Sequence, residues 1–144
     1  MGQQNSLTPR LVVARADEAI AFYQTVFGAK LVERFADDSG HVVHAALEVG
    51  GNAFSLTGEK KDWHNVSPAS LGGSPVILQL VVNDVDALAE RLAAAGAEEI
   101  FPVADQFYGH REGRFRDPFG HYWIVTTIVE QLSPEEITRR MSGS

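Results

Sequence analysis

The sequence contains no cysteine, which excludes disulfides, thiolate metal sites and cysteine nucleophiles. Basic residues are also few, because 12 Lys and Arg stand against 19 Asp and Glu and give a net charge of −7. Nucleic-acid binding requires a basic face, so this balance argues against such a partner. No apolar run approaches the roughly 18 residues that span a membrane, and no basic-then-apolar signal segment begins the chain. We therefore expect a cytoplasmic protein that contacts neither nucleic acid nor membrane.

The common catalytic motifs are absent as well. The sequence has no GxSxG, no glycine-rich phosphate-binding loop and no HExxH. Asp84 and Asp86 are better explained as residues of a helix start than as a general acid/base pair. With 144 residues, the chain is long enough for one domain with a buried core.

The clearest positive feature is an internal repeat with a period of about 68 residues. Residues 11–32 and 80–100 each contain a β-branched strand, an acidic helix start and a helix end at Gly-Ala. Val12 in the first copy corresponds to Val81 in the second. This period is longer than that of solenoid repeats, so we interpret it as two copies of a supersecondary module.

Each copy predicts a helix that buries one face against a sheet. The first helix should end at Gly28, and the second should begin at the capping residue Asp84 and end at Gly96. The predicted buried residues are Ile20, Tyr23 and Phe27 in the first helix and Val85, Leu88 and Leu92 in the second.

The remaining segments predict strands. Residues 41–50 alternate, with Val43, Ala45, Leu47 and Val49 expected on the helix side and His44, Ala46 and Glu48 on the other. Each half therefore has the order βαβββ, and the predicted fold class is α+β, with a sheet packed against each helix. We place module one at about residues 8–58, a linker at 59–75, module two at about 76–130 and a short C-terminal helix at 133–141.

Two βαβββ modules with Asp-Pro-x-Gly before the last strand resemble the vicinal oxygen chelate superfamily. This group includes glyoxalase I, extradiol dioxygenases and bleomycin-resistance proteins, and the resemblance covers roughly residues 8–130. The PhnB-like subgroup is the most similar, because YGHR (108–111) followed by GRFRDPFGH (113–121) matches a recurring pattern there. The resemblance implies a curled mixed sheet around a U-shaped cleft for a small ligand, with the helices on the outer face, and a homodimer.

The resemblance also implies which positions would carry the ligands of a metal ion. Metal-using members hold a divalent ion with His, Glu or Gln side chains of inner strands, and the ion acts as a Lewis acid. One such Glu lies four residues after the turn glycine; here that residue is Ile124. The opening strand of module two offers only Gln79, and PRLVVA (9–14) offers nothing. We predict no metal ligands and no cofactor, although a divalent ion held by His44, Gln79 and further partners stays an alternative.

Other residues are candidates for the cleft. His44 is expected either to face the cleft or to be hydrogen-bonded near the core. Arg111 could clamp an anionic group with Tyr108 stacked on it, or it could pair at the surface with Glu112 or Asp105. The predicted ligand-binding residues are His44, Phe54, Gln79, Tyr108, Arg111, Tyr122 and Ile124.

These residues favour a small-molecule-binding protein whose cleft takes an apolar or aromatic ligand, for sequestration or for metal-free chemistry. Whether it is an enzyme stays open, because no acid, base and nucleophile converge. One alternative is a divalent-metal-dependent lyase, isomerase or dioxygenase of the same superfamily. Another is an interaction scaffold with a filled cleft.

Overall fold

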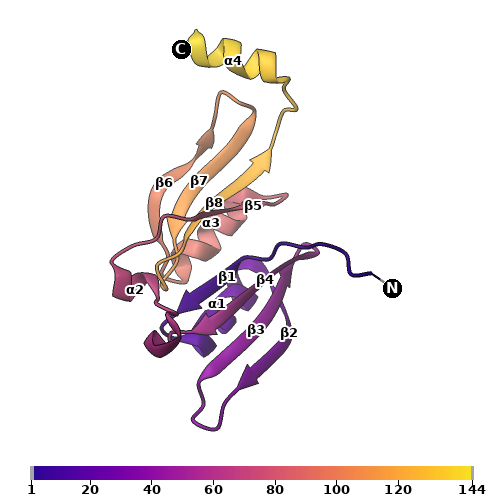
Figure 1. Cartoon of the computed structure of the whole chain (residues 1–144). Coiled ribbons are helices and arrows are strands. Elements are labelled where there is room, and N and C mark those ends of the chain that lie inside the picture. Colours follow the sequence, from indigo (N-terminus) through magenta and orange to yellow (C-terminus); the bar gives the residue numbers. More distant parts are fainter. Residues whose placement is uncertain (1, 144) are drawn as a thin grey trace. The chain divides into compact units, whose positions relative to one another are not determined.

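The computed structural model describes residues 2–143 and has two compact units, one ending at Gly73 and the other starting at Ser74. Each unit contains a four-stranded mixed sheet and one long helix in the order βαβββ (Figure 1). The predicted α+β fold with two βαβββ modules is therefore confirmed. None of the helices within residues 2–143 is both long and apolar enough to span a bilayer.

Module one consists of β1 (Arg10–Val13), α1 (Ala16–Phe27), β2 (Lys30–Ala36), β3 (Val42–Val49) and β4 (Asn52–Gly58). Its strand order is β1-β4-β3-β2, in which β1 and β4 are parallel and the other pairs are antiparallel. The predicted stripe of α1 is buried, and Tyr23 is completely so. Its ring packs edge-on against Phe54 of β4 at 5.5 Å, and the left-handed Gly28 ends the helix.

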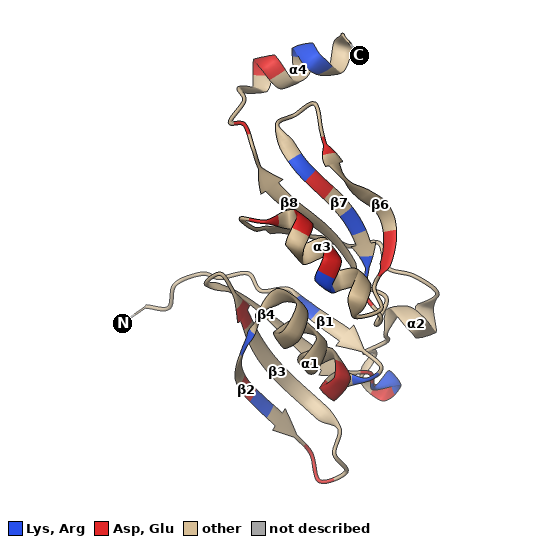
Figure 2. Cartoon of the chain, turned by 180° about the vertical axis from the view of Figure 1, so that it is seen from behind, with Lys and Arg blue, Asp and Glu red and all other residues tan. Residues whose placement is uncertain are grey.

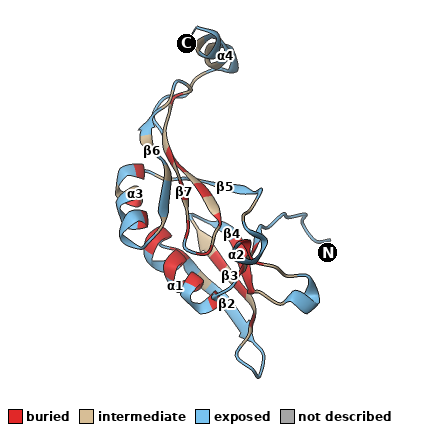
Figure 3. Ribbon diagram, turned by 90° about the vertical axis from the view of Figure 1, so that its left-hand side faces the viewer, coloured by how far each residue is buried: buried red, intermediate tan, exposed pale blue. Residues whose placement is uncertain are grey.

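Module two consists of β5 (Ile77–Val81), α3 (Val85–Ala94), β6 (Glu98–Asp105), β7 (His110–Arg116) and β8 (Tyr122–Ile128). The strand order β5-β8-β7-β6 repeats that of module one. The Asp84 side chain caps α3 by accepting a hydrogen bond from the Ala87 N–H at 3.1 Å, as predicted. Buried and exposed residues alternate along α1 and α3, so each helix has a buried side and an exposed side (Figure 3).

The alternation predicted for β3 holds only in part. Ala45 and Leu47 are fully buried, but Val42 is buried in place of Val43. The cause is a β-bulge: Ala36 pairs with Val42 and the preceding residue of β2 pairs with His44, so Val43 is an extra residue. One extra residue reverses the phase of a two-residue alternation.

The connection between the modules contains structure that the sequence did not predict. It holds a 3₁₀ turn, Lys61–Trp63, and a short helix α2, Pro68–Leu71. Ser67 caps α2, and its own N–H and hydroxyl donate to the Glu59 carboxylate. The predicted C-terminal helix is observed as α4, Pro134–Ser142.

Three tight turns end in the dipeptide Gly-His and share one geometry. They span residues 37–41, 106–110 and 117–121. In each, the first residue donates its N–H to the histidine carbonyl, at 3.0, 2.7 and 2.8 Å respectively. The glycines have φ values of 88°, 90° and 94°, which an L side chain rarely adopts. In this sequence the Gly-His dipeptide therefore marks the end of each of these three turns.

Candidate functional site

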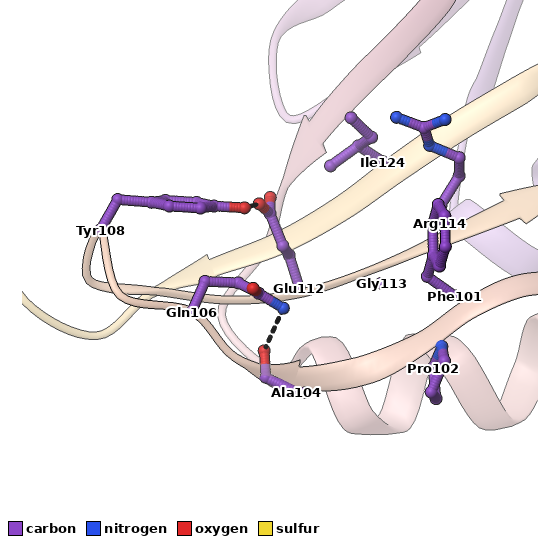
Figure 4. Close-up of a pocket in the computed structure, with 9 residues that line it drawn as sticks. All are labelled: Phe101, Pro102, Ala104, Gln106, Tyr108, Glu112, Gly113, Arg114 and Ile124. Carbon is purple, nitrogen blue, oxygen red and sulfur yellow. Dashed lines mark hydrogen bonds between the residues drawn. The ribbon is translucent and has the colours of Figure 1, made fainter. Parts of the chain in front are cut away.

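A pocket of about 390 Å³ lies on module two, on the side of its sheet away from α3 (Figure 4). Tyr108 and Glu112 stand at one end, Phe101 and Arg114 stand at the other, and Ile124 lies between them. The full lining is Phe101, Pro102, Ala104, Gln106, Tyr108, Glu112, Gly113, Arg114 and Ile124. The pocket therefore combines an apolar centre with an acidic and a basic group.

A bulge in β6 shapes this pocket. Phe101 pairs with Arg114 and Ala104 pairs with Glu112, so two residues of β6 lie opposite the single residue Gly113. A bulge of this kind bends the strand and turns its side chains aside. One of these two residues is Pro102, which has no N–H to donate and is tolerated at such an irregularity.

Gly113 permits the close passage of the bulged strand. A Cβ atom there would lie 2.9 Å from the Phe101 carbonyl oxygen and 2.9 Å from the Val103 nitrogen. Both are backbone atoms, so neither can move aside cheaply. The absence of a side chain at this position keeps β6 and β7 paired.

The acidic end of the pocket is held by hydroxyl groups. The Glu112 carboxylate accepts hydrogen bonds from the Tyr108 hydroxyl and from Thr126 Oγ1, the latter at 2.8 Å. His110 Nδ1 lies 3.9 Å from the same carboxylate, and the His110 ring contacts the Tyr108 ring at 5.2 Å. Only 12 % of the Glu112 side chain is exposed, so the carboxylate is fixed in place at the pocket wall.

The basic end of the pocket is a half-buried guanidinium. Arg114 lies over the Phe101 ring, with its guanidinium carbon 5.4 Å from the ring centre. Its Nε is buried and has no hydrogen-bond partner in the described chain. Within residues 2–143, no carboxylate lies within 4.0 Å of its nitrogens. Arg114 is therefore a cation without a counterion.

Two other predicted residues lie on or beside the same part of the sheet. Gln79 of β5 is in register with Ile124 of β8. Tyr122, two residues before Ile124, contacts Arg116, whose pKa is raised by the Tyr122 hydroxyl and by the Glu98 carboxylate. Neither Gln79 nor Tyr122 lines the pocket, so from the predicted set the structure brings together Tyr108 and Ile124.

Arg111 does not join Tyr108 at this pocket, and the predicted clamp is not formed. It belongs to strand β7, not to an irregular segment, and its guanidinium binds Asp86 of α3 at 2.9 and 3.0 Å. A further hydrogen bond of 3.2 Å reaches Asp105. The Arg111 bond lowers the pKa of Asp86, and both carboxylates raise the pKa of Arg111. Of the two predicted surface partners, Asp105 pairs with Arg111 and Glu112 does not, and the main partner, Asp86, was not predicted.

The remaining two predicted residues belong to module one. Phe54 is buried against Tyr23 beneath α1, so it is part of the core and not of a ligand site. His44 has both ring nitrogens engaged, with Arg10 at 2.8 Å and with Glu33 at 2.9 Å. Its ring also stacks on Phe35 at 5.9 Å.

The side chains do not fit the divalent ion that the fold suggests. Ile124 has no lone pair to donate, and Arg114, which is paired with it across the sheet, would repel a cation. In module one, Arg10 lies on the opening strand β1, and its guanidinium is hydrogen-bonded to the imidazole of His44. Across residues 2–143, no three His, Cys, Asp or Glu side chains converge as a metal site would need.

Sequence reasoning missed Glu112 and Arg114 for an identifiable reason. Phe115 is buried in the core, so alternation places Arg114 and Glu112 on the opposite face of β7. β7 carries charges of both signs along its length (Figure 2). The strand begins at His110, so both Glu112 and Arg114 lie within it.

Comparison with known proteins identifies the fold. Residues 4–125 match the family described as the glyoxalase/bleomycin resistance protein/dioxygenase superfamily. An uncharacterized protein of Mycobacterium bovis is 38% identical over 141 residues, which cover 96% of this chain and 93% of that protein. The crystal structure of TioX from Micromonospora sp. ML1 is 28% identical with a TM-score of 0.64 and covers 90% of this chain and all of that one. A PhnB protein from Bacillus cereus, 20% identical with a TM-score of 0.65, covers 85% of this chain and 99% of that one and shares the fold.

Proposed function

The chain belongs to the glyoxalase/bleomycin resistance protein/dioxygenase superfamily, and from this premise we propose that it binds a small organic molecule in the pocket of module two. The observation that carries the proposal is the pocket itself. Its volume of about 390 Å³ lies within the range of about 300–1,000 Å³ that is usual for ligand sites. Its lining joins aromatic and aliphatic side chains to a small number of charged ones, which is typical of a site that orients an organic ligand.

The role of binding is sequestration or a reaction that needs no metal. Glu112 is the one acid of the pocket, and its hydroxyl partners hold it in place. A fixed carboxylate can accept a hydrogen bond from a ligand, or a proton from it. The pocket lining contains no histidine, serine or cysteine as a nucleophile. This composition supports binding over covalent catalysis.

The proposal predicts ligand-dependent stabilisation. A thermal-shift screen with aromatic and aliphatic organic compounds should find molecules that raise the melting temperature, because a ligand at 100 times its Kd stabilises the folded state by about 2.7 kcal/mol. Ile124→Trp fills the pocket and should abolish the shift, whereas Leu71→Trp in the exposed part of α2 should preserve it. A broad screen without any stabilising compound would favour the interaction scaffold.

The metal-dependent alternative makes a different prediction. A lyase, isomerase or dioxygenase of this superfamily would carry a stoichiometric divalent ion after purification without chelator. Because the donor set does not fit, we expect elemental analysis to find less than stoichiometric Ni, Zn, Fe and Mn. A stoichiometric ion whose removal abolishes an activity would reverse the ranking.

We further propose that the protein is a homodimer and belongs to the PhnB-like subgroup. The subgroup is supported by the motif of residues 108–121. The dimer is supported by β5, an edge strand on which Ile77 and Val81 are exposed beside the exposed Val76. Apolar edge strands are uncommon on monomers, because they invite pairing with another chain. Light scattering at micromolar concentration should give twice the chain mass of 15.7 kDa, and the chain mass itself would contradict the dimer.

A further inference from the structure

We infer that the ligand of the module-two pocket is an organic anion whose acidic group binds Arg114 and whose far end donates a hydrogen bond to Glu112. This inference rests on the proposed function and adds the chemical class of the ligand. Two features of the pocket support it. Arg114 has no counterion, and Glu112, two residues earlier on the same strand, can accept further hydrogen bonds.

Several arginines of the chain pair with a carboxylate, and Arg114 does not. Arg34 pairs with Asp17, Arg111 with Asp86, Arg116 with Glu98, and both Arg139 and Arg140 with Glu136. Arg114 has no such carboxylate, and its Nε is buried without a hydrogen-bond partner. The cation that lines the pocket is therefore left without a counterion among residues 2–143.

Leaving this guanidinium unpaired has a free-energy cost, since its Nε is buried without a hydrogen-bond acceptor. A carboxylate, phosphonate or sulfonate group of a ligand supplies the missing countercharge and pairs with the terminal nitrogens of Arg114, because Nε itself is shielded. Guanidinium and carboxylate groups match in a two-pronged hydrogen-bonded geometry. An anionic ligand group is therefore the partner that best relieves the cost.

The surroundings of Arg114 favour a flat, apolar body next to the anionic group. The guanidinium carbon of Arg114 lies over the Phe101 ring, 5.4 Å from its centre, so an aromatic surface flanks the cation. Ile124 is paired directly with Arg114 across the sheet and forms the apolar floor of the pocket. An aromatic ring attached to the ligand's acidic group can lie over Ile124 and extend toward Glu112 at the other end of the pocket.

That other end is Glu112, two residues along the same strand. Residues two apart on a strand point to the same face and are separated by about 6.6 Å. Each Glu112 oxygen accepts one hydroxyl bond and keeps a second lone pair for a ligand donor. The two charged side chains do not pair with each other within 4.0 Å, so a ligand can bridge them. A hydroxyl or amine about one ring length from the acid satisfies this spacing.

The test uses three probes that differ by one group each. Calorimetric titration of the full-length protein with 4-hydroxybenzoate, its neutral methyl ester and benzoate separates the charge from the donor. We expect 4-hydroxybenzoate to bind at least about tenfold more tightly than the ester, which cannot pair with Arg114, and more tightly than benzoate, which lacks the donor for Glu112.

Two variants with a matched control locate the effect. Arg114→Gln should abolish the preference for the anion over the ester, and Ile124→Glu should do the same by placing a carboxylate opposite Arg114. Arg116→Gln lies on the same strand and face but outside the pocket, so it should keep the preference. All variants should retain a cooperative thermal transition.

The outcomes separate the inference from the proposed function. If the ester binds as tightly as the anion, or if Arg114→Gln keeps the preference, the anionic class is wrong while small-molecule binding stands. If benzoate binds as tightly as 4-hydroxybenzoate, the assignment of Glu112 as acceptor is wrong. If no probe binds and the broader screen also fails, both the inference and the proposed function are overturned.

Discussion

At the scale of single residues, Asp117 shows what the turn DPFG does. Its Oδ1 accepts hydrogen bonds from the N–H groups of Phe119 and His121 at 2.9 and 3.0 Å. Its Oδ2 accepts one from Trp123 Nε1 at 2.9 Å. The residue is buried, so these three bonds fix the hairpin from inside the core. The turn before β8 is therefore structural, and the ligand site proposed above lies along the neighbouring strands.

The first residue-scale prediction concerns this carboxylate. Asp117→Ala removes the three hydrogen bonds that this buried carboxylate accepts and should lower the free energy of unfolding by about 3 kcal/mol. The matched control is Asp37→Ala, where the same turn is exposed, and its loss should be clearly smaller. Urea denaturation of both variants measures the difference, and equal losses would contradict the structural role assigned to Asp117.

The second residue-scale prediction concerns Gly113. Gly113→Ala drives a methyl group against the β6 backbone at 2.9 Å and should cost about 1–3 kcal/mol of stability. Gly143→Ala, near the end of α4, has its nearest contact at 3.4 Å and should change stability little. A neutral effect of Gly113→Ala would mean that the bulge is not as tight as described.

At the scale of elements, the helices could be predicted well and the strands less well. The apolar spacing and the glycine and aspartate ends of α1 and α3 were sufficient, since each helix carries its own boundary signals. The edge strand β2 has almost no buried residue, so burial cannot impose an alternating pattern on it. The bulges in β3 and β6 depend on partner strands and leave no periodic signal in the sequence. Those irregularities include the one that shapes the pocket.

One element-scale prediction concerns the junction between β8 and α3. Thr127 Oγ1 accepts a hydrogen bond from the Val85 N–H at 3.0 Å and donates one to the Val82 carbonyl at 2.9 Å. Thr127→Val removes both and should destabilise the fold by about 1–2 kcal/mol. Thr138→Val, in the exposed helix α4, removes one bond to Pro134 and should cost less. Chemical denaturation distinguishes the two, and an equal cost would argue against a joining role for Thr127.

At the scale of the whole molecule, the two modules share a topology and differ in the side chains at equivalent places. Across the strands, one row of module one is Arg10, Ser55, Ala46 and Glu33, and the corresponding row of module two is Gln79, Ile124, Arg114 and Phe101. In module one, the cation binds His44, Ser55 and the Val43 carbonyl. In module two, the cation keeps its charge unpaired. The internal repeat predicted the shared topology, but only the pairing of the strands reveals this difference.

The central claim is that module two binds a small organic molecule at Arg114 and Glu112 without a metal. Two-dimensional ¹⁵N NMR of the labelled protein, titrated with 4-hydroxybenzoate in the presence of a chelator, tests it most directly. The account predicts saturable shifts concentrated at Glu112, Gly113, Arg114 and Ile124, including the Arg114 side-chain Nε–H. Shifts confined to module one, or shifts that appear only after a divalent ion is added, would contradict it.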